Sequence, residues 1–382
     1  MLRLPNKNEP ISIILKLAGD TCNINCTYCF EKRKPYEKAL IIKPDYIKRL
    51  LEISKGRIIN IELHGGEPLI IGMEKMLEIL NVLKTHDEKV NINIQTNGTL
   101  LNKQWIEFFI KEWPEISIGI SLDGDMKANS FRIDYQENFI TDKVEKTLKL
   151  LEDYEIEIGI IGVVTRNSLG RSQELLDYYS QFKSIKFIRF VPCLDYNVTA
   201  DNNKFNKKIK ELNPTNQGIP AWATTPLEYA NFVNDLYDTW KTKGYYNNFL
   251  LEPIQSVINK YYGNHTKLCH FTEMKCSYVL TLYPDGRIGS CDELSMPESV
   301  VGHINTVENI HDLLHMQSNK LLRNDLNKVL EKCNTCTYKN QCGGGCLATR
   351  VRYQDTPFYE EYCQHRIQII DYIYEDLLTV TN

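Results

Sequence analysis

Six short runs along the first half of the chain are rich in β-branched and other apolar residues, and polar or glycine-containing segments bound each run. Runs of this length and composition are typical of buried β-strands. Their nearly continuous apolar character indicates that both faces of the sheet are covered. The predicted strands are ISIILKLAG (11–19), IINIELHGG (58–66), NINIQTNG (91–98), SIGISLDG (117–124), EIGIIGVVT (157–165) and SIKFIRFVPC (184–193).

The segments between these runs carry apolar residues three and four positions apart, which is the spacing of one helix face. The predicted helices are 44–54, 73–86, 102–113, 141–154 and 172–182, with a last helix at 226–244. Alternation of strand and helix calls for parallel strands joined by right-handed crossovers. The pattern predicts an α/β fold in which six strand–helix units form an incomplete barrel or an open sheet.

Ligand sites in such folds lie at the carboxyl ends of the strands. The first four predicted strands are followed by polar or glycine-rich signatures, namely GDTC, HGGEP, QTNG and SLDG. From about 195 to 225 the chain is polar and rich in Asn and Pro, which predicts a loop insertion, either a solvated surface loop or a lid.

Charge and targeting signals narrow the class of protein. The 45 basic and 49 acidic residues give a formal net charge of −4, so no global positive field attracts nucleic acid or anionic lipid. We therefore expect a small molecule or a peptide as partner, and neither nucleic acid nor membrane. No N-terminal segment combines a basic start with an apolar core, which predicts a cytoplasmic protein.

Twelve cysteines in a cytoplasmic chain indicate metal ligation or redox chemistry, because that compartment keeps thiols reduced. Cys22, Cys26 and Cys29 lie within eight positions. Three thiolates on a four-iron cluster leave one iron without a protein ligand and open to a substrate or cofactor. A zinc site completed by a distant cysteine or histidine is the alternative.

The spacing Cys-x3-Cys-x2-Cys, with the aromatic Tyr28 before the last cysteine, resembles the radical S-adenosylmethionine (SAM) superfamily. The resemblance implies a partial (β/α)6 TIM-like barrel and a [4Fe-4S] cluster whose unique iron chelates SAM. An electron from the reduced cluster then cleaves SAM to a 5′-deoxyadenosyl radical. The residues that match the family's cofactor-binding positions are Tyr28, Gly65, Gly66, Glu67, Gln95, Asn97, Ser121, Asp123 and Arg132.

Eight of the twelve cysteines lie beyond residue 265, and their spacing resembles the SPASM extension of radical SAM enzymes. The resemblance implies two auxiliary [4Fe-4S] clusters, three in all, and a β-hairpin over 279–293. One auxiliary cluster would be bound by Cys269, Cys276, Cys291 and Cys346, and the other by Cys333, Cys336, Cys342 and Cys363. A pair of zinc sites, or a non-catalytic zinc-ribbon interaction protein, is the alternative.

SPASM enzymes mostly act on peptides, so the resemblance implies an oxidoreductase with a peptide substrate and an external electron donor such as flavodoxin or ferredoxin. Asp292 lies where sulfatase-maturating enzymes have their catalytic base. The stretch after Cys346, LATRVRYQDTPFYEEYC, lacks the basic run expected of those enzymes. We therefore expect a maturase that cross-links a ribosomally made peptide (RiPP biosynthesis, cyclophane or thioether type). Formylglycine formation and peptide epimerisation are the alternatives.

A cross-linking maturase must hold a leader peptide. Some ten residues precede the first predicted strand, so we expect a separate protein or the catalytic core, with 195–225 as a candidate segment, to bind the leader. The predicted domains are a radical SAM core at 1–245, a linker and helix at 246–268, a SPASM domain at 269–365 and a C-terminal helix at 366–382.

Overall fold

The computed structural model describes residues 4–6, 9–33, 40–193, 219–272, 275–294, 299–354 and 356–381. The chain divides into two compact units, neither of which is continuous in sequence. Unit 1 comprises Met1–Asn23, Arg33–Gly119 and Glu273–Lys328, and unit 2 comprises Ile24–Lys32, Ile120–Thr272 and Val329–Asn382.

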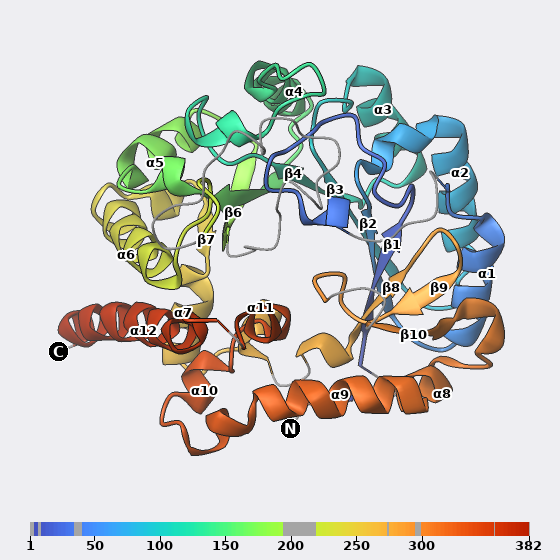
Figure 1. The fold of residues 1–382 in the computed structure, drawn as a ribbon. Helices are drawn as coiled ribbons and strands as arrows, with labels where there is room; N and C mark the ends of the chain where they lie inside the picture. The colour runs from blue at the N-terminus through green and yellow to red at the C-terminus, as the bar shows by residue number, and fades with distance from the viewer. Residues whose placement is uncertain are drawn as a thin grey trace. The chain divides into compact units, whose positions relative to one another are not determined.

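Unit 1 contains a sheet with the strand order β10-β9-β8-β1-β2-β3. Its strands are β1 (Ile11–Lys16), β2 (Ile59–His64), β3 (Val90–Thr96), β8 (Val279–Leu282), β9 (Arg287–Gly289) and β10 (Val300–His303). Its helices are α1 (Pro44–Ile53), α2 (Gly72–Leu83), α3 (Lys103–Glu112), α8 (Ile310–His315) and α9 (Gln317–Val329). Figure 1 shows α1, α2 and α3 along one side of β1 to β3.

Strand β1 has parallel neighbours on both sides, β2 and β8. Alternate side chains of β1 are buried, including Ile11, Ile13 and Leu15, as expected for a strand covered by helices. In the second pairing Ile13 lies opposite Leu280, so a strand from the far end of the sequence completes this side of the sheet. The antiparallel β8–β9 pair confirms the hairpin predicted over 279–293.

Unit 2 contains the parallel strands β5, β6 and β7 in that order. These strands are β5 (Ile158–Val164), β6 (Ile185–Pro192) and β7 (Leu250–Glu252). Its helices are α4 (Thr141–Asp153), α5 (Ser172–Ser180), α6 (Pro226–Thr242), α7 (Ile254–Tyr261), α10 (Lys339–Cys342), α11 (Leu347–Tyr353) and α12 (Tyr359–Thr381). Helix α12 packs against α6 and α7. Strand β4 (Ser117–Ser121) crosses the boundary between the units, which follows Gly119.

The helix ends follow ordinary capping chemistry. Thr225 and Glu228 form a capping box at the start of α6, with Pro226 in the first turn. The side chain of Asn102 caps α3 by accepting a hydrogen bond from the backbone of Trp105. Within the described part of the chain, no helix is long and apolar enough to span a membrane.

The six strands and six helices predicted from periodicity are present at the predicted places, with ends shifted by a few residues. Most of the predicted insertion at 195–225 lies outside the described residues, which resume at Ile219. Cys193, predicted to be a small buried residue, is 6% exposed and packs in an apolar cluster with Ile219 and Trp222. Helix α12 begins before the predicted C-terminal helix and includes most of it.

Candidate functional site

In unit 1, the glycine-rich loop after β2 lies against the loop that leads to Cys22. The N–H of Gly66 donates to the Gly19 carbonyl at 2.8 Å, and the N–H of Glu67 donates to the Thr21 carbonyl at 2.9 Å. A Cβ atom at Gly66 would lie 2.3 Å from the Thr21 carbonyl oxygen. Only glycine permits this approach of two backbones, so the motif sets the path of the chain into the cysteine segment.

The Glu67 carboxylate is fully buried and joins two strand ends. It accepts hydrogen bonds from the backbone N–H of Leu69 at 3.0 Å, the Thr96 hydroxyl at 2.8 Å and the backbone N–H of Asn97 at 2.8 Å. Gly65, just before it, has a φ of +141°. Glu67 therefore holds the loops after β2 and β3 together.

The loop after β3 reaches the first cysteine of the motif. The side-chain amide of Asn97 donates to Asn23 Oδ1 at 2.9 Å and lies 3.7 Å from Cys22 Sγ. The side chain of Gln95 lies over Gly119, where an added Cβ would be 2.3 Å from Gln95 Oε1. Asn97 thus supplies an N–H donor to a sulfur that the sequence predicts to be a metal ligand.

In unit 2, Tyr28 lies between Arg132 and Asp123. An isolated β-bridge joins Ile24 to Asp134 and brings the cysteine loop beside the segment that carries Arg132. Arg132 Nη1 donates to the Tyr28 hydroxyl at 3.1 Å, and that hydroxyl donates to Asp123 Oδ2. This chain of hydrogen bonds links three of the predicted cofactor-binding residues.

Burial dominates the electrostatics of this group. It raises the pKa of Tyr28 well above its ordinary value, and it raises the pKa of Asp123, although Arg132 opposes both changes. Burial alone would lower the pKa of Arg132, but Tyr28, Cys26 and Asp123 raise it well above its usual range. Within the described residues, Arg132 Nε has no hydrogen-bond partner, so it remains available to an anionic group. Ser121 ends β4 and is half-buried.

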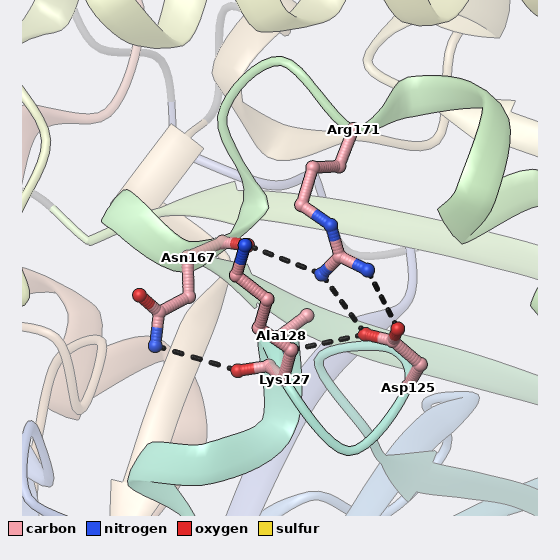
Figure 2. A network of polar contacts seen from close by, with 5 residues as sticks. All are labelled: Asp125, Lys127, Ala128, Asn167 and Arg171. Atoms are coloured by element: carbon pink, nitrogen blue, oxygen red, sulfur yellow. Dashed lines mark hydrogen bonds and ion pairs between the residues drawn. The ribbon is translucent and has the colours of Figure 1, made fainter.

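A second polar network of unit 2 holds the loop after β4 against the segment that leads into α5 (Figure 2). Two guanidinium nitrogens of Arg171 bind the two carboxylate oxygens of Asp125, at 2.6 and 3.1 Å. Asp125 also accepts from the backbone N–H of Ala128, and Asn167 donates to the Lys127 carbonyl at 3.4 Å. The bidentate pair fixes the geometry of the loop that follows Asp123.

The three cysteines of the N-terminal motif divide between the units, with Cys22 in unit 1 and Cys26 and Cys29 in unit 2. Among the described residues, no group of three or more His, Cys, Asp or Glu side chains is arranged to hold a single metal ion. A four-iron cluster needs a wider arrangement, because each thiolate binds a different iron. Each unit therefore contributes its own donor, with Asn97 beside Cys22 in unit 1 and the Arg132 Nε in unit 2.

Asp292 lies in unit 1, just beyond the β8–β9 hairpin, and only 7% of it is exposed. Its Oδ2 is 2.7 Å from Nζ of Lys16, a fully buried residue at the end of β1. Lys16 also donates to His64 Nδ1 at 3.0 Å, and Asp292 Oδ1 is 4.0 Å from Cys291 Sγ. An ammonium group so close favours the ionised form of the carboxylate.

Sequence reasoning missed Lys16 and His64 as site residues. The available signal was one charged residue inside the apolar run ISIILKLAG, and the histidine that ends β2 before the two glycines. A buried lysine requires a partner. Local patterns could not reveal it, because the partner, Asp292, lies 276 positions away in the sequence.

The C-terminal cysteines form groups within each unit. In unit 1, a hydrogen bond from Cys291 lowers the pKa of the Cys276 thiol, assisted by Lys275, whereas burial opposes this change. Cys269 lies in a 3-10 helix of unit 2, Cys269–Phe271, that packs against the backbone of Gly343.

The remaining cysteines lie in unit 2. Cys333 is close enough to three other thiols to interact electrostatically with them, and burial raises its pKa. These three are Cys336, Cys342 and Cys363. Unit 2 thus contains the four cysteines that the resemblance to SPASM enzymes assigns to one auxiliary cluster. The backbone N–H of Cys346, predicted to bind the other cluster, donates to the Tyr362 hydroxyl at 2.7 Å.

Comparison with known proteins identifies the class. Residues 17–184 match the family model described as the radical SAM superfamily. An uncharacterized protein of Methanocaldococcus jannaschii, MJ0907, is 34% identical over 213 residues, which are 52% of this chain and 70% of that protein. The chain belongs to the radical SAM superfamily. Membership implies SAM and an iron–sulfur cluster as cofactors.

The chain is also similar to anaerobic sulfatase-maturating enzymes over nearly its whole length. It is 26% identical to the cysteine-type enzyme of Clostridium perfringens (strain 13 / Type A), across 98% of this chain and 99% of the relative. It is 24% identical to the serine-type enzyme of Bacteroides thetaiotaomicron, across 97% and 92%.

A solved structure of anSMEcpe with bound AdoMet and Cp18Cys peptide has a TM-score of 0.79 at 23% identity, and the match covers 97% of this chain and 99% of that one. This similarity shows the fold. It is the predicted partial (β/α)6 radical SAM barrel, followed by a cysteine-rich SPASM region.

These similarities overturn the expectation of a peptide cross-linking maturase with a leader peptide. That expectation depended on the missing basic run after Cys346, which proves to be a poor criterion. The basic residues Arg350 and Arg352 are spaced along α11, and Arg350 is buried against cysteine sulfurs. A helix distributes such residues around its surface, so adjacent positions in the sequence do not define one charged face.

Proposed function

We propose that this chain is an anaerobic sulfatase-maturating enzyme, which oxidises a cysteine or serine of a sulfatase peptide to formylglycine. The observation that carries the proposal is the similarity to cysteine-type and serine-type enzymes across 97% or more of the chain. The buried, ion-paired Asp292 beside Cys291 supports it, because the oxidation requires a base next to the reacting carbon.

Cys22, Cys26 and Cys29 are the proposed ligands of the SAM-binding cluster, and the loops after β1 to β4 would hold SAM. Arg132 is proposed to pair with the SAM carboxylate, since its Nε is buried and available. The other proposed cofactor-binding residues are Tyr28, Gly65, Gly66, Glu67, Gln95, Asn97, Ser121 and Asp123. Glu67 and Asn97 act partly by fixing the loops, as their hydrogen bonds indicate.

When bound, SAM and its reduced cluster would supply a carbon radical able to take one hydrogen atom from the substrate Cβ, and an oxidised auxiliary cluster would accept one electron. The Asp292 carboxylate takes the proton of the substrate thiol or hydroxyl. The substrate thus loses a hydrogen atom, a proton and an electron, which together amount to a two-electron oxidation. A serine then yields the aldehyde directly, whereas the thioaldehyde from a cysteine adds water and loses hydrogen sulfide.

Lys16 prepares Asp292 for this role. Its ammonium group, buried and 2.7 Å from the carboxylate, favours the ionised form that can accept a proton. The contact with His64 Nδ1 gives the ammonium group a second partner and so helps to fix its direction. Lys16 is therefore a positioning residue, and Asp292 is the proposed catalytic residue.

We further propose two auxiliary [4Fe-4S] clusters, three clusters in all, with an external donor such as flavodoxin or ferredoxin. Cys269, Cys276, Cys291 and Cys346 would bind one auxiliary cluster, and Cys333, Cys336, Cys342 and Cys363 the other. The thiols of the second set interact electrostatically in unit 2, which supports their assignment to one cluster.

The test is anaerobic incubation of the reconstituted chain with SAM, a reductant and a sulfatase peptide that carries either cysteine or serine. The expected product is formylglycine, detected by mass spectrometry and an aldehyde-reactive probe. Comparing the two peptides identifies the substrate residue. If neither peptide is modified while SAM is cleaved, the chain acts on another class of substrate and the proposal is rejected.

The Asp292→Asn variant tests the base. We expect SAM cleavage to continue and formylglycine to fall at least a hundredfold, as removal of a general base predicts. Glu293→Gln is the matched control, because it neutralises the adjacent carboxylate. Equal formylglycine yields from the two variants would exclude Asp292 as the base.

A further inference from the structure

Two arginines of unit 2 are buried beside the C-terminal cysteines. Arg350 lies on α11 and is 1% exposed, and Arg366 lies on α12 and is 7% exposed. Burying a guanidinium ion is costly unless an anion or several acceptors compensate for the lost water. The partners of these two side chains therefore indicate what the surrounding site is built to hold.

The partners are mainly cysteine sulfurs. Arg350 Nη2 lies 3.3 Å from Cys363 Sγ and 3.7 Å from Cys333 Sγ. Arg366 Nε donates to Cys342 Sγ at 3.0 Å, and its Nη2 donates to the Cys342 carbonyl at 2.7 Å. Three of the four thiols in this set thus receive an N–H donor from a cation.

Aromatic rings fix the direction of both guanidinium groups. Arg366 Cζ lies 4.6 Å from the centroid of the Phe271 ring, and Arg350 Cζ lies 5.3 Å from that of Tyr362. Arg350 Nε also donates to the Gly344 carbonyl. Each cation is held in place before any ligand binds, so its donors need little reorganisation.

The charges of the two arginines are not matched by carboxylates. In the part of the chain that the structure describes, neither guanidinium forms a salt bridge with Asp or Glu, and the groups that raise the pKa of Arg350 are Cys363, Tyr362 and Cys333. Burial opposes that increase. The anionic thiolates of a bound cluster would provide the missing negative charge.

We propose that Arg350 and Arg366 raise the reduction potential of the cluster bound by Cys333, Cys336, Cys342 and Cys363. The inference rests on the ligand assignment made with the proposed function. Reduction adds one electron from the donor and makes the cluster more negative by one charge, with no bond formed or broken. Fixed cations and N–H···S hydrogen bonds stabilise the more negative state, because charge and hydrogen bonds at the sulfurs set cluster potentials.

The experiment is an anaerobic redox titration of the reconstituted full chain, followed by electron paramagnetic resonance. Cys336 is exposed. The Cys336→Ala variant should lose this cluster, and therefore about four irons per chain, so the signal that disappears in this variant belongs to this cluster. In Arg350→Gln and Arg366→Gln we expect the reduced-to-oxidised ratio of that signal to fall about tenfold at a fixed potential, which is ~59 mV for one electron.

Lysine variants separate charge from hydrogen bonding. Arg350→Lys and Arg366→Lys keep the charge but lose the planar donor group, so we expect a smaller shift in the same direction. The lysine variants also provide a second measurement of the potential if a glutamine variant fails to retain iron. The matched control is Arg166→Gln, which removes an arginine of unit 2 whose partner is Glu228 at 3.2 Å, and we expect no shift.

An unchanged potential in variants that keep their iron would overturn the proposal, as would a Cys336→Ala variant that loses neither iron nor signal. Formylglycine formation by the unsubstituted chain tests the proposed function separately. A shifted potential without formylglycine would sustain the role of the arginines and reject the substrate, so the two failures are distinguishable.

Discussion

Replacing Lys16 with methionine leaves the Asp292 carboxylate buried without its cation. Lys16 is fully buried, the Asp292 side chain is 10% exposed, and the two charged atoms are 2.7 Å apart. Removing one partner of a buried ion pair costs about 3–5 kcal/mol, because the remaining charge keeps its desolvation penalty. We therefore expect Lys16→Met to lower the free energy of unfolding of unit 1 by about this amount.

The assay is native-state hydrogen exchange of the peptides that cover β1 and β8, combined with urea unfolding. The matched control is Lys75→Met, which breaks a pair of similar length, 2.9 Å from Glu78, whose side chains are 48% and 41% exposed. Exposed pairs contribute about 0–1 kcal/mol, since water screens them. We expect protection of β1 to fall a hundredfold or more in Lys16→Met and hardly at all in Lys75→Met.

A double variant, Lys16→Met with Asp292→Asn, removes both charges. Because no ion then remains buried, we expect it to recover part of the stability that Lys16→Met loses. The reasoning is refuted if Lys16→Met costs no more than Lys75→Met, or if the second substitution adds its full cost to the first.

Three further predictions concern the free energy of unfolding. Burial lowers the pKa of His365 to about 3, so the contribution of this residue should be complete above about pH 6.5 and should fall by ~1.4 kcal/mol per pH unit between about pH 6.5 and about 3. The His365→Gln variant should show a smaller dependence of the urea midpoint on pH. Gly66→Ala places a Cβ 2.3 Å from a carbonyl oxygen and should cost about 1–3 kcal/mol, whereas Gly159→Ala, with 3.7 Å of room, should cost less than about 1 kcal/mol by thermal unfolding. Tyr28→Phe removes the hydroxyl that donates to buried Asp123 and should cost roughly 1–3 kcal/mol, and a thermal midpoint equal to that of the unsubstituted chain would contradict this.

The sequence by itself determined the elements of the fold and the chemistry of the cofactor. Hydrophobic periodicity is a local property, so the strand ISIILK and the helix PLEYANFVNDLYDTWKT were predictable from their own residues. The spacing of Cys22, Cys26 and Cys29 likewise identified the superfamily. The sequence predicted a peptide substrate but a wrong reaction on it, because a linear charge pattern after Cys346 does not show how a helix, Leu347–Tyr353, places its basic residues.

Tertiary structure alone decided which side chains support the predicted site. Lys16 meets Asp292 because β8 pairs with β1, across 276 positions of sequence. Arg350 and Arg366 reach Cys333, Cys363 and Cys342 because α11 and α12 bring them there. Local patterns carry no information on such pairings, since burial and ion pairing depend on contacts between distant segments. The sequence thus determined the elements and the thiols, and the fold decided which charges surround them.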